Sequence, residues 1–192
     1  MKNLSKKLLE FIKTEKNFNP NLCQTEAALK LEDFLFSRNS ILLSILNKPK
    51  KGVYIHGAVG IGKSILANAL QNIIHNSEIH HFSDVMFELQ KVRSGKKLLN
   101  KFKSKVILID EFFINNLASL VLFKNFLKEF RKKIIILISN RPPQKVYFDK
   151  VNLNLCEELK KTLKNDFYEI FMKSTLDFRK ESRINENFFF LN

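Results

Sequence analysis

The stretch that decides the fold reads Gly57-Ala58-Val59-Gly60-Ile61-Gly62-Lys63-Ser64. It matches G-x-x-x-x-G-K-[ST], the P-loop pattern of nucleotide-binding proteins. The chain has only 5 glycines, and three of them fall within these eight positions. A short strand-like run at 53–56 precedes the motif, and apolar residues repeat at helical spacing across 65–74 after it. The sequence therefore predicts the strand, loop and helix that the motif requires.

The residues of this loop suit a nucleoside triphosphate and its magnesium ion. Small residues let the backbone N–H groups of 57–62 point inward as an anion-binding nest, at the positive end of the helix that follows. Lys63 is expected to reach the β- and γ-phosphate oxygens, and the Ser64 hydroxyl to ligate Mg²⁺. The alternative, a glycine-rich turn without a ligand, needs neither Lys63 nor Ser64.

Composition restricts the classes of partner. The 192 residues carry a net charge of +14, which attracts polyanions and acidic surfaces. The charge is spread along the chain, however, and its densest runs flank apolar segments, as solvated surface charge does. Most basic residues are Lys rather than Arg, and no module combines basic and aromatic residues. Nucleic acid is therefore an unfavoured partner.

Several features favour a cytoplasmic protein of bacterial origin. Cys23 and Cys156 fit neither a zinc pattern nor a disulfide framework, so they are predicted to be free thiols in a reducing compartment. No apolar run has the length of a transmembrane span, and the basic N-terminus lacks a signal-peptide core. The abundance of Lys, Asn, Ile and Phe is compatible with an AT-biased genome.

Strands and helices are predicted to alternate along the chain, which indicates an α/β fold with a right-handed parallel sheet. The first 50 residues are expected to be helical, with Asn19-Pro20 as the cap of a helix whose apolar stripe runs over 27–35, and a second helix at 41–46. Strands are expected at 53–56, 79–82, 106–109, 134–138 and 166–172, and further helices at 83–91, 120–130 and 153–164.

An acidic pair follows one of these strands and completes the predicted site. Asp110 and Glu111 come directly after the apolar run 106–109. Such a pair is common at strand ends, but downstream of a P-loop it is typical of the Walker B element. Asp110 is expected to hold Mg²⁺ through its water shell, and Glu111 to orient or deprotonate the attacking water.

The next strand ends in Ser139-Asn140, where AAA-type ATPases carry a polar sensor residue. Asn140 can donate and accept hydrogen bonds, so it could contact the γ-phosphate or the water. The alternative is an Asn that starts a turn before Pro142, and Arg141 suits either phosphate contact or a surface position. His80 and His81 face opposite sides of a strand, which argues against a shared metal and for structural or surface roles.

Five collinear segments resemble the ZapE-like ATPases, the bacterial cell-division ATPase and its mitochondrial relatives. They are 51–64 (KGVYIHGAVGIGKS, similar to KGLYLYGGVGRGKT), 81–86 (HFSDVM, HFHxFM), 110–114 (DEFFI, DEFFV), 139–143 (SNRPP) and 177–179 (DFR, DYR). The resemblance implies an AAA-like core that hydrolyses ATP with Mg²⁺. In the family this activity serves division at the bacterial membrane or mitochondrial protein quality control, so a protein client, a homo-oligomer and peripheral membrane association are open.

Three departures from the family pattern qualify this expectation. Asn116 and Ser119 replace acidic residues, no Arg follows Tyr147 before Arg179, and the chain stops shortly after DFR. The expected organisation is a helical segment (1–50), an ATPase core (51–180) and a tail (181–192), with the C-terminal lid missing. Without an evident arginine finger, slow turnover is expected. Two alternatives remain: a nucleotide- or partner-binding remnant without efficient turnover, and a helicase-loader-like ATPase.

Overall fold

The centre of the fold is a five-stranded sheet with the order β2-β3-β4-β1-β5. The structure is a computed structural model that describes residues 3–15, 19–39, 50–91 and 100–173. Every strand pairing is parallel, which confirms the predicted sheet type. The strands are β1 (Gly52–Gly57), β2 (Ser77–His81), β3 (Val106–Asp110), β4 (Ile134–Ser139) and β5 (Phe167–Met172).

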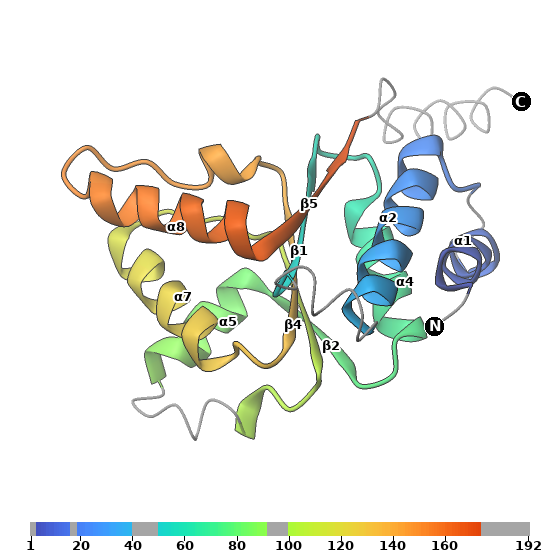
Figure 1. Cartoon of the computed structure of the whole chain (residues 1–192), viewed down its shortest axis with the longest axis horizontal. Helices are drawn as coiled ribbons and strands as arrows, with labels where there is room; N and C mark the ends of the chain where they lie inside the picture. Colours follow the sequence, from blue (N-terminus) through green and yellow to red (C-terminus); the bar gives the residue numbers. More distant parts are fainter. Residues whose placement is uncertain (1–2, 16–18, 40–49, 92–99, 174–192) are drawn as a thin grey trace, which may run out of the picture.

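Helices cover both faces of the sheet (Figure 1). One face carries α1 (Leu4–Glu15), α2 (Leu22–Asn39) and α4 (Lys63–Ile73), and the other α5 (Phe82–Lys91), α7 (Leu117–Glu129) and α8 (Leu153–Asp166). A short 3-10 helix, η1 (Pro143–Lys145), follows β4. Alternate strand residues enter two cores, which explains why the central strands β3 and β4 are almost entirely apolar.

Aromatic side chains fill the core between the sheet and the second group of helices. The ring of Phe112 lies 4.7 Å from that of Phe123 on α7 and 5.1 Å from that of Phe82 on α5, measured between centroids. Phe112 is 1% exposed. Because it follows the acidic pair directly, its burial anchors the loop that carries Asp110 and Glu111.

The start of α2 corrects one prediction. Asn19-Pro20 is not the cap, because the helix begins at Leu22. The Gln24 backbone N–H donates to Asn21 Oδ1 at 2.8 Å, and the Asn21 N–H donates to Gln24 Oε1 at 3.0 Å. This reciprocal pair of hydrogen bonds is a capping box with Asn21 as the cap. The helix therefore begins two residues later than the Asn19-Pro20 pair predicted. The apolar stripe over 27–35 is buried as predicted, while 41–46 lies outside the described residues.

None of the helices in the described ranges combines the length and apolar character needed to cross a membrane.

Candidate nucleotide-binding site

The sheet order brings the predicted site residues to one edge. β4 lies between β1 and β3, so the carboxyl ends of all three strands are neighbours. His56 pairs with Ser139 across β1 and β4, and Ile109 pairs with Leu137 across β3 and β4. The phosphate loop, the acidic pair and Asn140 therefore follow adjacent strand ends. Parallel α/β sheets bind their ligands at this edge.

The phosphate loop has the backbone that the motif requires. Gly60 and Gly62 have φ values of 87° and 88°, in the left-handed region that favours glycine. α4 begins immediately afterwards at Lys63, so its free N–H groups face the loop. Lys63 is only 7% exposed, and its ammonium donates to the carbonyls of Gly57 at 2.9 Å and Ala58 at 2.6 Å. Ser64 is exposed. The loop thus holds its lysine close to its own backbone.

The acidic pair occupies two different environments. Asp110 is 9% exposed, and its Oδ1 accepts a hydrogen bond from the Glu111 backbone N–H at 2.8 Å. Glu111 has a φ of 53°, a conformation that L residues with side chains seldom adopt and that recurs at functional sites. Its side chain is 69% exposed. The strand end therefore buries one carboxylate and projects the other into solvent.

His81 contributes to this edge in a way that the sequence did not indicate. It is the register partner of Asp110, and its Nδ1 lies 3.6 Å from Glu111 Oε2. His80 instead packs edge-to-face on Phe102 with 5.0 Å between ring centroids. The two histidines thus have separate surroundings. Only the pairing of β2 with β3 places His81 beside Glu111.

Ser139 ties the two loops of the site together. It is 2% exposed, and its hydroxyl donates to the Phe112 carbonyl at 2.8 Å while accepting from the Arg141 N–H at 3.1 Å. The Tyr54 hydroxyl donates to the Arg141 carbonyl at 2.8 Å. Burial raises the pKa of Tyr54 well above its ordinary value, which keeps the phenol protonated as a donor. The loops after β3 and β4 are therefore held as one unit.

Replacing Ser139 with Ala tests this connection. The change leaves a buried carbonyl and N–H without their partner, so we expect the free energy of unfolding to fall by about 1–3 kcal/mol. We also expect slower ATP hydrolysis with unchanged ATP affinity. Urea denaturation and phosphate release measure the two effects, and the exposed Ser83→Ala is the control. Unchanged stability and rate in Ser139→Ala would show that the connection is dispensable.

Two polar residues at the start of α2 contact the phosphate loop from outside. Gln24 is fully buried, and its Nε2 donates to the Gly62 carbonyl at 3.4 Å. Asn21 Nδ2 donates to the Ile61 carbonyl at 3.5 Å. A Cβ atom at Gly62 would lie 2.2 Å from Gln24 Nε2. The motif itself gives no hint of this contact; the sequence signal is the Asn-x-x-Gln spacing of a capping box.

Gly62→Ala is therefore expected to distort the loop for two reasons. The left-handed backbone costs an alanine about 1–2 kcal/mol, and the new Cβ meets Gln24. We expect lower stability and ATP binding weakened by at least about tenfold, measured by thermal unfolding and by titration calorimetry.

The double variant Gly62→Ala/Gln24→Ala separates these causes. It should recover part of the loss, because the side-chain clash is removed while the backbone strain stays. Strictly additive effects of the two substitutions would contradict the contact between them.

Solved structures share this architecture. The DnaC helicase loader superimposes with a TM-score of 0.56 at 20% identity, over 82% of this chain and 94% of that chain. DnaI superimposes with a TM-score of 0.57 at 18% identity, over 80% of this chain and 84% of that chain. Domain III of the Thermotoga maritima replication initiation protein DnaA superimposes with a TM-score of 0.54 at 18% identity, over 91% of this chain and 72% of that chain. These likenesses establish the fold, and with the phosphate loop they define the chain as a P-loop NTPase domain.

The family is narrower than this class. The AFG1-like ATPase family matches residues 13–191, which is nearly the whole chain. The protein belongs to the AFG1-like ATPase family. This confirms the resemblance inferred from the motifs, because the family contains the ZapE and Afg1 relatives.

Proposed function

We propose that this protein binds ATP with Mg²⁺ through the phosphate loop and hydrolyses it at the carboxyl edge of the sheet. The observation that carries the proposal is the convergence of three strand ends. β1 leads into the loop of residues 57–64, β3 ends at Asp110 directly before Glu111, and β4 between them leads to Asn140. Membership of an ATPase family supports the same reaction.

Binding is assigned to the loop, Lys63, Ser64 and Asp110. The backbone amides of 57–62 and the start of α4 balance phosphate charge, and Lys63 supplies a cation beside them. Magnesium prefers oxygen ligands and takes few of them from protein when it binds together with phosphates. Ser64 and Asp110 fit that role. Among the described residues no group of three or more His, Cys, Asp or Glu forms an alternative metal cage.

Hydrolysis is assigned to Glu111, with Asn140 assisting. The exposed Glu111 carboxylate can accept a proton from water or orient it, next to the buried Asp110, which would help to hold the metal ion. Asn140 is exposed at the end of the strand between the phosphate loop and the acidic pair. This position supports the sensor interpretation over that of a simple turn residue.

For the cellular role we propose a broad class rather than a particular client. The ZapE-like motifs favour a cytoplasmic, division-related ATPase that acts on a protein client, as a homo-oligomer or at the membrane surface. Turnover is expected to be slow, because no arginine finger is evident, and a binding remnant without efficient turnover is the main rival. The likeness to a helicase loader supports a second candidate. Salt-sensitive binding of single-stranded DNA that depends on Lys63 would favour it.

Steady-state phosphate release tests the proposal. The intact protein should release phosphate from ATP in the presence of Mg²⁺ and stop when EDTA removes the ion. Lys63→Ala and Glu111→Gln, prepared identically, exclude a contaminating ATPase. Equal activity in all three proteins would refute the assigned site. Tight ATP binding by the wild type without turnover would instead select the non-hydrolysing rival.

A further inference from the structure

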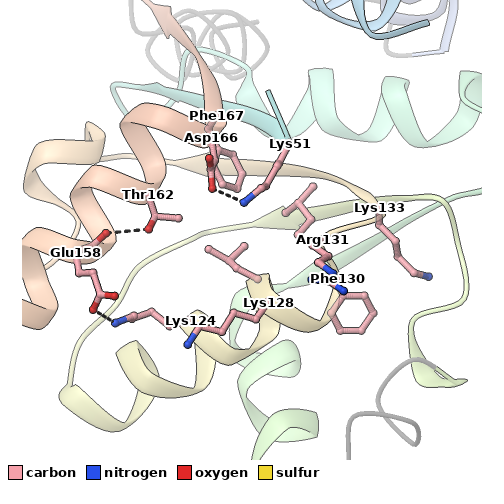
Figure 2. Close-up of a pocket in the computed structure, with 12 residues that line it drawn as sticks. Lys51, Lys124, Lys128, Phe130, Arg131, Lys133, Glu158, Thr162, Asp166 and Phe167 are labelled. Atoms are coloured by element: carbon pink, nitrogen blue, oxygen red, sulfur yellow. Dashed lines mark hydrogen bonds and ion pairs between the residues drawn. The ribbon is translucent and has the colours of Figure 1, made fainter. Parts of the chain in front are cut away.

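A cavity lies at the amino-terminal ends of the strands, on the opposite side of the sheet's length from the phosphate loop. It has a volume of about 350 Å³ and opens between α7 and α8, over the starts of β1, β4 and β5 (Figure 2). We call it the basic pocket, after the five cationic residues in its lining: Lys51, Lys124, Lys128, Arg131 and Lys133. None of the residues assigned to nucleotide binding lines it.

The charge of the basic pocket is only partly neutralised. Lys51 pairs with Asp166 at 2.6 Å, and Lys124 pairs with Glu158. Five cations against these two carboxylates leave a formal charge of +3 in the lining. The Lys124 hydrogen bond, and after it the charges of Lys124 and Lys128, lower the pKa of Glu158.

Two cations of the lining are available to a ligand. Lys128 and Arg131 are exposed, and neither forms an ion pair with any carboxylate in the described parts of the chain. The Lys133 ammonium, in contrast, is occupied by the carbonyls of Phe102 and Ser104. Arg131 offers a planar fork of donors that suits a carboxylate. The pocket thus presents two cations, Lys128 and Arg131, that can bind carboxylates.

The floor of the basic pocket is apolar but offers no stacking surface. It consists of Leu127, Phe130, Ile135 and Phe167. Phe130 and Phe167 are 0% and 3% exposed, so their ring faces are already packed within the core. Single-stranded nucleic acids are held by stacking on exposed aromatic faces, which this pocket lacks. Leu127 is only partly buried, so an aliphatic side chain of a ligand can still contact it.

We propose that the basic pocket binds an acidic peptide segment of a partner protein. Its carboxylates contact Lys128 and Arg131, and an aliphatic side chain between them covers Leu127. Charge complementarity identifies the occupant, because the lining is cationic and its own two carboxylates are already paired. The pocket and the nucleotide site lie at opposite ends of the strands, so occupancy of one leaves the other accessible.

Fluorescence anisotropy of the full chain with a labelled Glu-Glu-Leu-Glu-Glu-Leu-Glu-Glu peptide tests this proposal. The pocket variant is Lys128→Glu/Arg131→Glu. The control is Lys132→Glu/Lys161→Glu, which changes the net charge equally at two exposed lysines outside the lining. We expect the pocket variant to weaken binding at least about tenfold and the control to weaken it far less. Thr162→Phe, which fills the cavity without changing charge, should also weaken binding.

Four results would overturn the proposal. The first is that the wild type does not bind the peptide, and the second is that the pocket and control variants lose peptide affinity equally. The third is that an oligothymidylate of similar length binds more tightly than the peptide and depends on the same pocket residues. The fourth is that replacing both leucines of the peptide with serine leaves its affinity unchanged. Melting curves verify that each variant is folded. If Lys128→Glu/Arg131→Glu does not fold, the charge-neutralising variant Lys128→Gln/Arg131→Gln takes its place. Lys63→Ala should bind the peptide normally, so failure of the nucleotide site and failure of this pocket are distinguishable.

Discussion

Glu111→Gln should reduce ATP hydrolysis by at least about 100-fold while ATP binding stays near that of the wild type. Gln has the shape of Glu but cannot accept a proton from water. The side chain is 69% exposed at the end of β3, so its replacement disturbs no buried contact and alters only the 3.6 Å approach to His81. Binding rests on the phosphate loop and Asp110, which the change leaves intact. Binding and chemistry should therefore separate in this variant.

Single-turnover phosphate release and calorimetric ATP titration measure the two properties. Glu129→Gln, which removes an exposed carboxylate from α7, is the matched control and should behave as the wild type. Wild-type hydrolysis by Glu111→Gln would mean that another group activates the water. A parallel loss of ATP affinity would instead place Glu111 among the binding residues.

Lys63→Ala should remove measurable ATP binding. Each hydrogen bond to a charged group is worth about 1.5–3 kcal/mol, so the loss of two phosphate contacts weakens affinity by about 100-fold or more. The fold should survive, because in this structure the ammonium bonds to carbonyls of a loop that water can reach in part. Hydrolysis should be lost together with binding, unlike in Glu111→Gln.

Titration with a fluorescent ATP analogue measures the affinity, and circular dichroism the fold. Lys13→Ala, at an exposed position on α1, controls for the loss of one positive charge. Retained ATP affinity in Lys63→Ala would refute the role assigned to the phosphate loop. Equal weakening in Lys13→Ala would indicate a non-specific charge effect.

Much of the fold was predictable because the central strands β3 and β4 are strongly apolar and because segments with helical periodicity separate the strands. The predicted strand at 106–109 and the helix at 153–164 match β3 and α8 to within two residues. The order of the strands does not follow from these patterns, since parallel strands can be connected in several ways. That order is what places Asn140 between the phosphate loop and the acidic pair, and His81 beside Glu111.

The parts that escaped prediction depend on contacts between distant segments. Gln24 lies far from Gly62 in sequence, and only the packing of α2 against the loop brings them together. The run Arg131-Lys132-Lys133 has the sequence pattern of solvated charge. In the structure Lys132 is exposed, Arg131 lines the basic pocket, and Lys133 bonds to two carbonyls. Local charge patterns could not reveal a pocket whose lining comes from α7, α8, the strands β4 and β5, and Lys51 before β1.

The contact between α2 and the phosphate loop also bears on the size of the smallest part of the chain that can fold independently. α1, α2 and α4 share one apolar core with the sheet, and Leu8, Leu31 and Leu70 are fully buried in it. A fragment starting at β1 would keep every residue of the motif yet expose this face to water. The smallest autonomous folding unit around the loop therefore includes the N-terminal helices, although they contain none of the nucleotide-binding motifs.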